Sequence, residues 1–145
     1  VEFEIDCLRA AAEERGEDLL AAMIARGIVD PDAGVTADEC LEYTLAASEW
    51  NLVDRMLTVT PSLATSGLLL AVNPRGGRFA GMKSQYLPPE HLFSRRADFL
   101  TFGVLGQLEA TANWHRIARE WIYGDPPTTA IGADEQAWLA HARNR

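Results

Sequence analysis

The segment from residue 88 to residue 123 constrains the fold most, because no other long stretch repeats its apolar residues with a clear helical period. These residues follow one another at steps of three or four, which places them along one side of a helix with about 3.6 residues per turn. The pattern predicts one continuous helix over 88–123. The residues of this stripe are Phe93, Ala97, Leu100, Val104, Leu108, Thr111, Trp114, Ala118 and Trp121.

Between residues 97 and 108 the helix is apolar or small on its other sides as well, through Phe99, Phe102, Gly103, Leu105 and Gly106. A helix that is apolar nearly all round is normally enclosed by other helices. We therefore expect a central core helix in which Leu100, Val104 and Leu108 are almost fully buried and the two glycines allow close helix crossing. We also expect five aromatic side chains to lie in the core: Trp50, Phe99, Phe102, Trp114 and Trp121.

Capping signals divide the first 60 residues into helices. The first 27 residues favour helix and end near Gly27, with Gly16 as a point where the segment can divide. Alternating apolar and acidic residues over 1–7 leave a strand open there. Thr36 and Glu39 have the spacing of a capping box and predict the start of a further helix.

The second half of the chain carries its own starts and stops. Thr60-Pro61 indicates another helix start, and that helix would end before Asn73-Pro74. Pro88-Pro89 starts the long helix, and the Gly-Asp-Pro-Pro run at 124–127 ends it. A short final helix is expected over about 133–142. The chain is thus predicted to be all-α, a single domain over 1–145 with about five helices packed around the central one. The alternative is an α+β fold with a small hairpin near 67–82.

Charge and composition exclude several classes of protein. The net charge is −8, and residues 1–54 carry 14 acidic and 3 basic side chains. A domain with this balance repels phosphate backbones, so we expect no nucleic acid as partner. No apolar run approaches the length that crosses a bilayer, and the acidic N-terminus does not resemble a signal peptide, so we expect a cytoplasmic protein that binds no membrane. Cys7 and Cys40 are expected to be reduced, buried thiols.

The best candidate for ligand binding is a basic, glycine-containing loop over residues 73–84. Its glycines would let backbone N–H groups approach a ligand, and its three cations could neutralise a phosphate or a carboxylate. The predicted anion-contacting residues are Arg75, Gly76, Gly77, Arg78 and Lys83. The loop differs from a nucleotide-binding P-loop, because Met82 separates Gly81 from Lys83 and Pro88-Pro89 prevents a helix directly after Ser84. Alternatively, these cations form a solvated connector or offset the acidic first half of the chain.

No catalytic residues, metal ligands or cofactor are predicted. His91 and His115 would lie about 36 Å apart on one straight helix, so they cannot share a site. No Glu-x-x-His pair occurs, and the serines lack a nucleophile motif. His91 is expected on the surface at a helix start. In the absence of a catalytic pattern, the sequence favours a non-catalytic helical interaction protein or accessory subunit, with a protein partner or self-association. The alternative is a small-molecule binder, or a helical enzyme with an apolar pocket lined by aromatic residues.

Overall fold

The computed structural model describes residues 2–72, 85–86 and 88–143, and within them the chain is mainly α-helical. The all-α prediction is confirmed, with seven helices in this part rather than about five. A short turn of 3₁₀ helix precedes the third helix, and two very short strands complete the fold. The elements are α1 (Glu2–Ala12), α2 (Gly16–Ala25), η1 (Pro31–Ala33), α3 (Ala37–Leu52), β1 (Leu57–Thr58), α4 (Pro61–Val72), α5 (Pro89–Gln107), β2 (Thr111–Ala112), α6 (Trp114–Ile122) and α7 (Ala130–Arg143).

The best-buried core lies among the first three helices. Leu19 and Cys40 are completely buried, and Ala11 is almost so. Gly16 starts α2 against α3, where a Cβ atom would lie only 3.0 Å from the carbonyl oxygen of Ala37. The predicted division near Gly16 is therefore confirmed. Residues 2–12 are helical, so the strand alternative for residues 1–7 is wrong over the part that the structure describes.

The predicted helix caps are present. The Thr36 hydroxyl accepts a hydrogen bond from the backbone N–H of Glu39 at 3.1 Å, and the Thr60 hydroxyl accepts one from the N–H of Leu63 at 3.2 Å. Each hydroxyl satisfies an N–H that has no partner within its helix. Gly27 and Gly124 follow the ends of α2 and α6 with φ of 74° and 73°, a conformation that glycine adopts without strain.

The prediction of one helix over 88–123 is wrong, because the chain leaves the helix between Gln107 and Trp114. Glu109 has φ of 48°, and the side chain of Asn113 caps α6 by accepting from the N–H of Arg116 at 3.1 Å. Between them β2 pairs antiparallel with β1. The hairpin alternative near 67–82 is also wrong where it can be examined, since residues 67–72 belong to α4 and 73–82 lie outside the described residues.

Three aromatic side chains join the two halves of the fold. The Trp50 ring on α3 lies 5.1 Å from Phe102 on α5 and 6.0 Å from Trp114 on α6. The Trp114 indole N–H also donates to the carbonyl of Leu57 at 2.8 Å. These three side chains are half-buried and pack on one another outside the fully buried core, and Trp121 is 65% exposed, so the expectation of core positions is met only in part.

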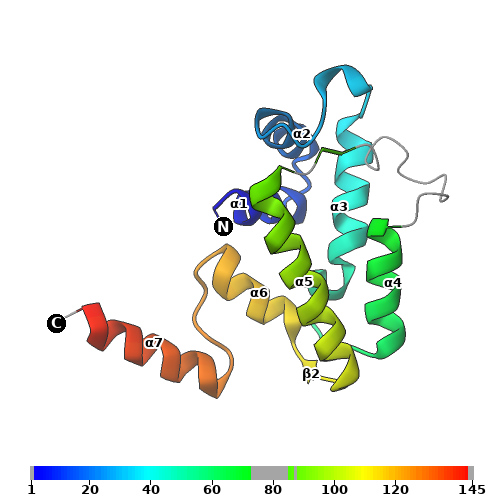
Figure 1. The fold of residues 1–145 in the computed structure, drawn as a ribbon. Helices are drawn as coiled ribbons and strands as arrows, with labels where there is room; N and C mark the ends of the chain where they lie inside the picture. The colour runs from blue at the N-terminus through cyan, green and yellow to red at the C-terminus, as the bar shows by residue number, and fades with distance from the viewer. Residues whose placement is uncertain (1, 73–84, 87, 144–145) are drawn as a thin grey trace.

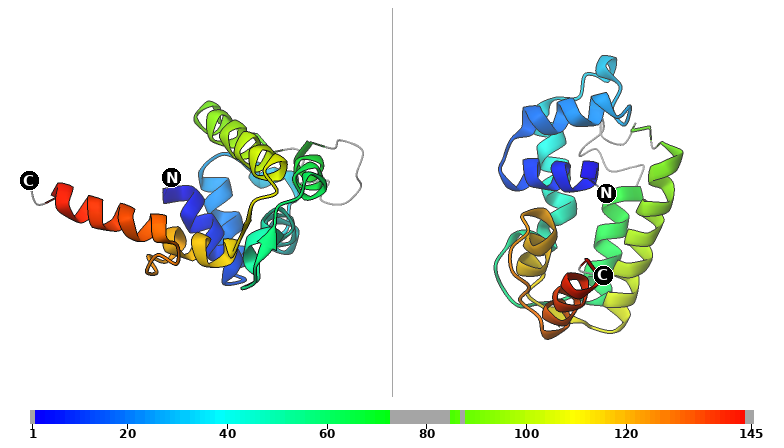
Figure 2. Two further views of the ribbon diagram at one scale, coloured as in Figure 1. Left: turned by 90° about the horizontal axis from the view of Figure 1, so that it is seen from below. Right: turned by 90° about the vertical axis from the view of Figure 1, so that its left-hand side faces the viewer.

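The helices are arranged so that α4 and α5 lie side by side, while α1, α3 and α6 form the neighbouring group (Figure 1). The last helix, α7, extends away from the remaining helices (Figure 2). Among the described helices, none combines the length and the apolar content that crossing a bilayer requires.

Candidate functional site

The residues of α5 that the sequence places in the core face solvent instead. Phe93 is 74% exposed, Leu100 61%, Val104 52% and Leu108 71%, and Ala97 between them is exposed too. The prediction that Leu100, Val104 and Leu108 are buried is therefore wrong. These five residues form one continuous apolar strip, which we call the α5 outer face.

The opposite side of α5 is the side that packs. A Cβ atom at Gly106 would lie 2.9 Å from the Cβ of Ala64 on α4, and one at Gly67 would lie 3.2 Å from the Phe102 ring. Close crossing at Gly106 is thus confirmed, whereas Gly103 faces open space. Within the part of the chain that the structure describes, the helix is thus packed on one of its two apolar sides only.

A second exposed apolar strip occurs on α7. Ile131 is 82% exposed, Trp138 68% and Leu139 38%. Steps of seven and four bring Ile131, Trp138 and Ala142 to one side of the helix, with Leu139 beside them. We call these four residues the α7 apolar face. All residues from 130 to 142 except Gly132 are exposed, so α7 covers little of its own surface against this chain.

The start of α7 is fixed to α6. The Glu120 carboxylate accepts from the backbone N–H and the hydroxyl of Thr128, at 2.7 and 2.9 Å. The hydroxyl of Thr129 accepts from the N–H of Gly132 at 3.0 Å and so caps α7. Arg119 pairs with Asp125 at 2.6 Å within the same connection. The direction in which α7 leaves the body is therefore set by hydrogen bonds.

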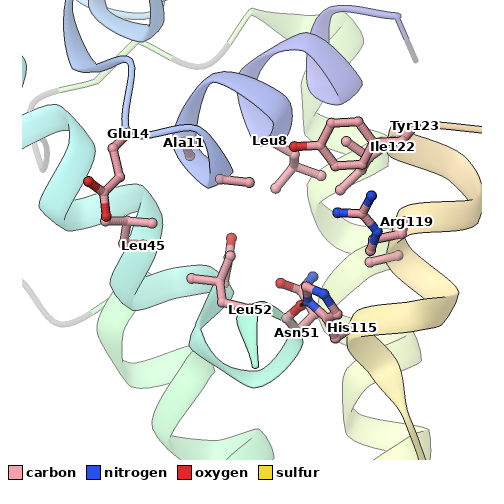
Figure 3. Close-up of a pocket in the computed structure, with 13 residues that line it drawn as sticks. Leu8, Ala11, Glu14, Leu45, Asn51, Leu52, His115, Arg119, Ile122 and Tyr123 are labelled. Carbon is pink, nitrogen blue, oxygen red and sulfur yellow. Dashed lines mark hydrogen bonds between the residues drawn. The ribbon is translucent and has the colours of Figure 1, made fainter. Parts of the chain in front are cut away.

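A small cavity of about 280 Å³ lies between α1, α3 and α6. Figure 3 shows Leu8 and Ala11 of α1, Leu45 and Leu52 of α3, and Ile122 of α6 around it. Polar side chains complete the lining: Glu14, Ser48, Asn51, His115, Arg119 and Tyr123. Apolar and polar side chains are therefore mixed in the lining, as they are in many small-molecule sites.

Several polar side chains of the lining already contact other groups of the chain. His115 Nδ1 donates to the backbone carbonyl of Asn51 at 3.1 Å. Arg119, besides its ion pair with Asp125, lies 4.5 Å from the centre of the Tyr123 ring. Burial and the neighbouring Glu13 carboxylate raise the pKa of Tyr123, so its hydroxyl stays protonated near neutral pH. This arrangement can hydrogen-bond a small polar ligand but contains no activated nucleophile.

His91 is buried rather than exposed, so the expectation of a surface histidine is wrong. Its Nδ1 lies 2.8 Å from a Glu4 carboxylate oxygen, and its Nε2 accepts from Arg26 Nε at 3.0 Å. The Phe3 ring packs edge-on against the imidazole, with the ring centres 5.4 Å apart. Because both ring nitrogens are engaged, His91 ties the start of α5 to α1 and to the end of α2.

The two cysteines are free, buried thiols, as the sequence predicts. Burial raises the pKa of each thiol to about 11. Both side chains therefore stay neutral and act as small apolar groups of the core.

The predicted anion-contacting residues Arg75, Gly76, Gly77, Arg78 and Lys83 fall within 73–84, outside the described residues. Within the described ranges, no group of three His, Cys, Asp or Glu side chains is arranged to hold a metal ion. The chain matches no protein-family model, no curated protein and no solved structure.

The two exposed helix faces are the site that sequence reasoning missed. The signal was present in the period of residues 93–108, but periodicity gives a shared side of a helix and not what covers that side. For α7 the signal was weaker, because Asp134 and Glu135 interrupt its apolar residues.

Proposed function

We propose that this chain is a non-catalytic helical interaction protein, a subunit of a larger assembly, and that the α5 outer face is its main binding surface. One observation carries the proposal: the second half of α5 is apolar on both sides, yet among the described residues only the side that faces α4 and Trp50 is packed, while Leu100, Val104 and Leu108 are more than half exposed. A continuous apolar strip on a folded protein marks a contact surface more often than a solvated one.

The energetics support a partner. Burying a large apolar side chain contributes about 1.5–3 kcal/mol, and the four large residues of the outer face leave most of that contribution unused in the isolated chain. Phe93 lies near the start of the 19-residue α5 and Leu100 just beyond its centre, so large exposed side chains that could anchor a partner occur along much of the helix. The polar clusters at His91 and Arg119 are engaged in holding helices together, which also favours a structural role for them.

The test is native mass spectrometry of the tagged chain, purified gently, with two matched variants. Ala97→Glu places a charge on the α5 outer face without removing any packed side chain, and Ala21→Glu makes the same change at an exposed position of α2. We expect the wild type and Ala21→Glu to appear above the mass of one chain, with a copy or a partner. We expect Ala97→Glu to appear as a single chain.

Two outcomes would contradict the proposal. The first is a wild type that remains a single chain under all gentle conditions. The second is a complex whose abundance is the same in Ala97→Glu and Ala21→Glu, because the outer face would then not contribute to it.

A second candidate function is small-molecule binding in the cavity between α1, α3 and α6. Its support is a lining that combines apolar side chains with the polar groups of Asn51, His115 and Tyr123. Ala118 lines this cavity, so Ala118→Leu would fill part of it, and Ala21→Leu serves as the control. A ligand retained by the wild type and the control but lost in Ala118→Leu would favour this candidate. Equal retention by all three would exclude this cavity.

A further inference from the structure

We infer that the partner on the α5 outer face is α7 of a second copy of this chain, and that two copies exchange α7 reciprocally. This inference rests on the proposed function and names the occupant of its binding surface. Such a pair has two-fold symmetry, with each copy giving one helix and receiving one.

The first argument is that α7 requires a covering surface. A helix of 14 residues with nearly every side chain exposed has little to stabilise it, because isolated helices of about 12–15 residues are marginal in water. Ile131 and Trp138 would supply the packing energy if another surface covered them.

The second argument is that α7 does not reach the α5 of its own chain in the observed arrangement. The connection after α6 is fixed by Glu120 to Thr128 and by Arg119 to Asp125. From this anchor α7 runs outward, away from the other helices (Figure 2). To reach the α5 of its own chain, α7 would have to leave this anchor in another direction, whereas a second copy can meet α7 as it stands.

The third argument is that the two strips match in length. The α5 outer face runs from Phe93 to Leu108, about 22 Å of helix, and the α7 apolar face runs from Ile131 to Ala142, about 16 Å. The shorter strip therefore fits within the longer one. Both have their large side chains at helical steps, so ridges of one can enter grooves of the other.

The α5 strip and the α7 strip carry opposite charges at matching positions. Arg96 is exposed and lies three residues after Phe93 and four before Leu100, at the edge of the α5 strip. Asp134 is exposed and stands in the same relation to Ile131 and Trp138 on α7. Glu135, also exposed, lies between Ile131 and Leu139 within the α7 strip itself. A basic residue at the edge of one strip and two acidic residues on the other favour their pairing over the pairing of two copies of the same strip.

Complementation between two broken variants tests the exchange. Ala97→Glu damages the receiving face and leaves α7 intact, whereas Trp138→Ala damages α7 and leaves the receiving face intact. Ala21→Glu and Ala140→Glu are the controls, the latter on the opposite side of α7 from the apolar face. Sedimentation equilibrium of the full chain gives the dissociation constant of each sample, and far-UV circular dichroism checks that each variant is folded.

We expect the wild type and both controls to form dimers, and each broken variant alone to bind itself at least tenfold more weakly. In a mixture of the two broken variants, one undamaged α7–α5 contact becomes possible, so heterodimers should form more tightly than either variant binds itself. Failure of the mixture to recover association would overturn the exchange. Self-association of Trp138→Ala as tight as that of the wild type would also overturn it and would indicate α5 against α5.

The other outcomes separate this inference from the proposed function. A wild type that is a single chain by itself, but binds a different protein through Ala97, would overturn the exchange and retain the proposed function. A wild type that neither self-associates nor binds a partner through Ala97 would overturn both.

Discussion

A matched pair of leucine truncations distinguishes the structure from the prediction that the sequence makes. Leu19 on α2 is completely buried, and Leu100 on α5 is 61% exposed. The sequence pattern assigns Leu100 to the centre of the core, whereas the structure assigns that place to Leu19. Leu19→Ala and Leu100→Ala remove the same atoms, so their difference reports burial alone.

The expected magnitudes follow from the exposure of the two side chains. Truncating a fully buried leucine to alanine costs about 2–5 kcal/mol of unfolding free energy. About two-fifths of Leu100 is covered, and complete burial of a leucine is worth about 1.5–3 kcal/mol, so its truncation should cost at most about 1 kcal/mol. The higher helix propensity of alanine offsets part of that loss.

The assay is urea unfolding followed by tryptophan fluorescence, at a chain concentration low enough to keep copies apart. With a slope of about 1–3 kcal/mol per molar urea, Leu19→Ala should lower the midpoint by about 1 M or more, and Leu100→Ala by a few tenths. At high chain concentration the difference in urea midpoint between Leu100→Ala and the wild type should grow, because association stabilises the wild type more. Equal losses for both variants at low concentration would refute the fold described for α5.

Three further predictions concern the cap, the thiols and an ion pair. Thr36→Ala should lower the unfolding free energy by about 1 kcal/mol, while Thr36→Ser should retain most of it, because serine keeps the hydroxyl that accepts from Glu39; equal losses in urea titrations would contradict the cap. Because burial raises the pKa of Cys7 and Cys40 to about 11, iodoacetamide near neutral pH should modify neither thiol in the folded chain and both thiols in urea. Rapid labelling of the folded chain, measured by mass spectrometry, would contradict this and would show that the thiols are accessible. Hydrogen bonds from Arg116 and Asn113 lower the pKa of Asp54, so the stability this carboxylate contributes is present above its unfolded pKa of about 3.9 and is lost as pH falls through its folded value. The stability difference between the wild type and Asp54→Asn should therefore shrink on acidification, and a difference independent of pH would contradict the ion pair.

Local signals in the sequence predicted the helix ends well. Thr36, Thr60 and Gly27 act through neighbours a few residues away, so their roles can be read without knowledge of the fold. The all-α class followed from the same signals together with helical periodicity. The buried state of the two cysteines likewise agreed with the usual behaviour of free thiols.

The predictions from the sequence were wrong where segments far apart in the chain determine the local structure. The break after Gln107 depends on β1, which lies about fifty residues earlier in the sequence and pairs with Thr111 and Ala112. Periodicity continued through the break because the residues after it resume a similar spacing. Only Asn113, with a side chain suited to an N-cap, marked the new start locally.

The position of the candidate site could be predicted only in part. The apolar strip of α5 was visible in the sequence, but the sequence could not show that α4 and Trp50 of α3 pack on the other side of this helix, around Gly106 and Phe102. The engagement of His91 by Glu4 and Arg26 was also invisible, because those residues come from helices far apart in the chain.

The central claim is that the α5 outer face is exposed in a single chain and covered in the functional assembly. The most direct measurement is the relaxation that a soluble paramagnetic probe causes at the methyl groups of Leu100 and Val104, recorded for the dilute chain and for the associated form. We expect strong relaxation in the dilute chain and protection on association, with Leu19 protected in both states. Equal relaxation of Leu100 and Val104 in the two states would contradict the claim.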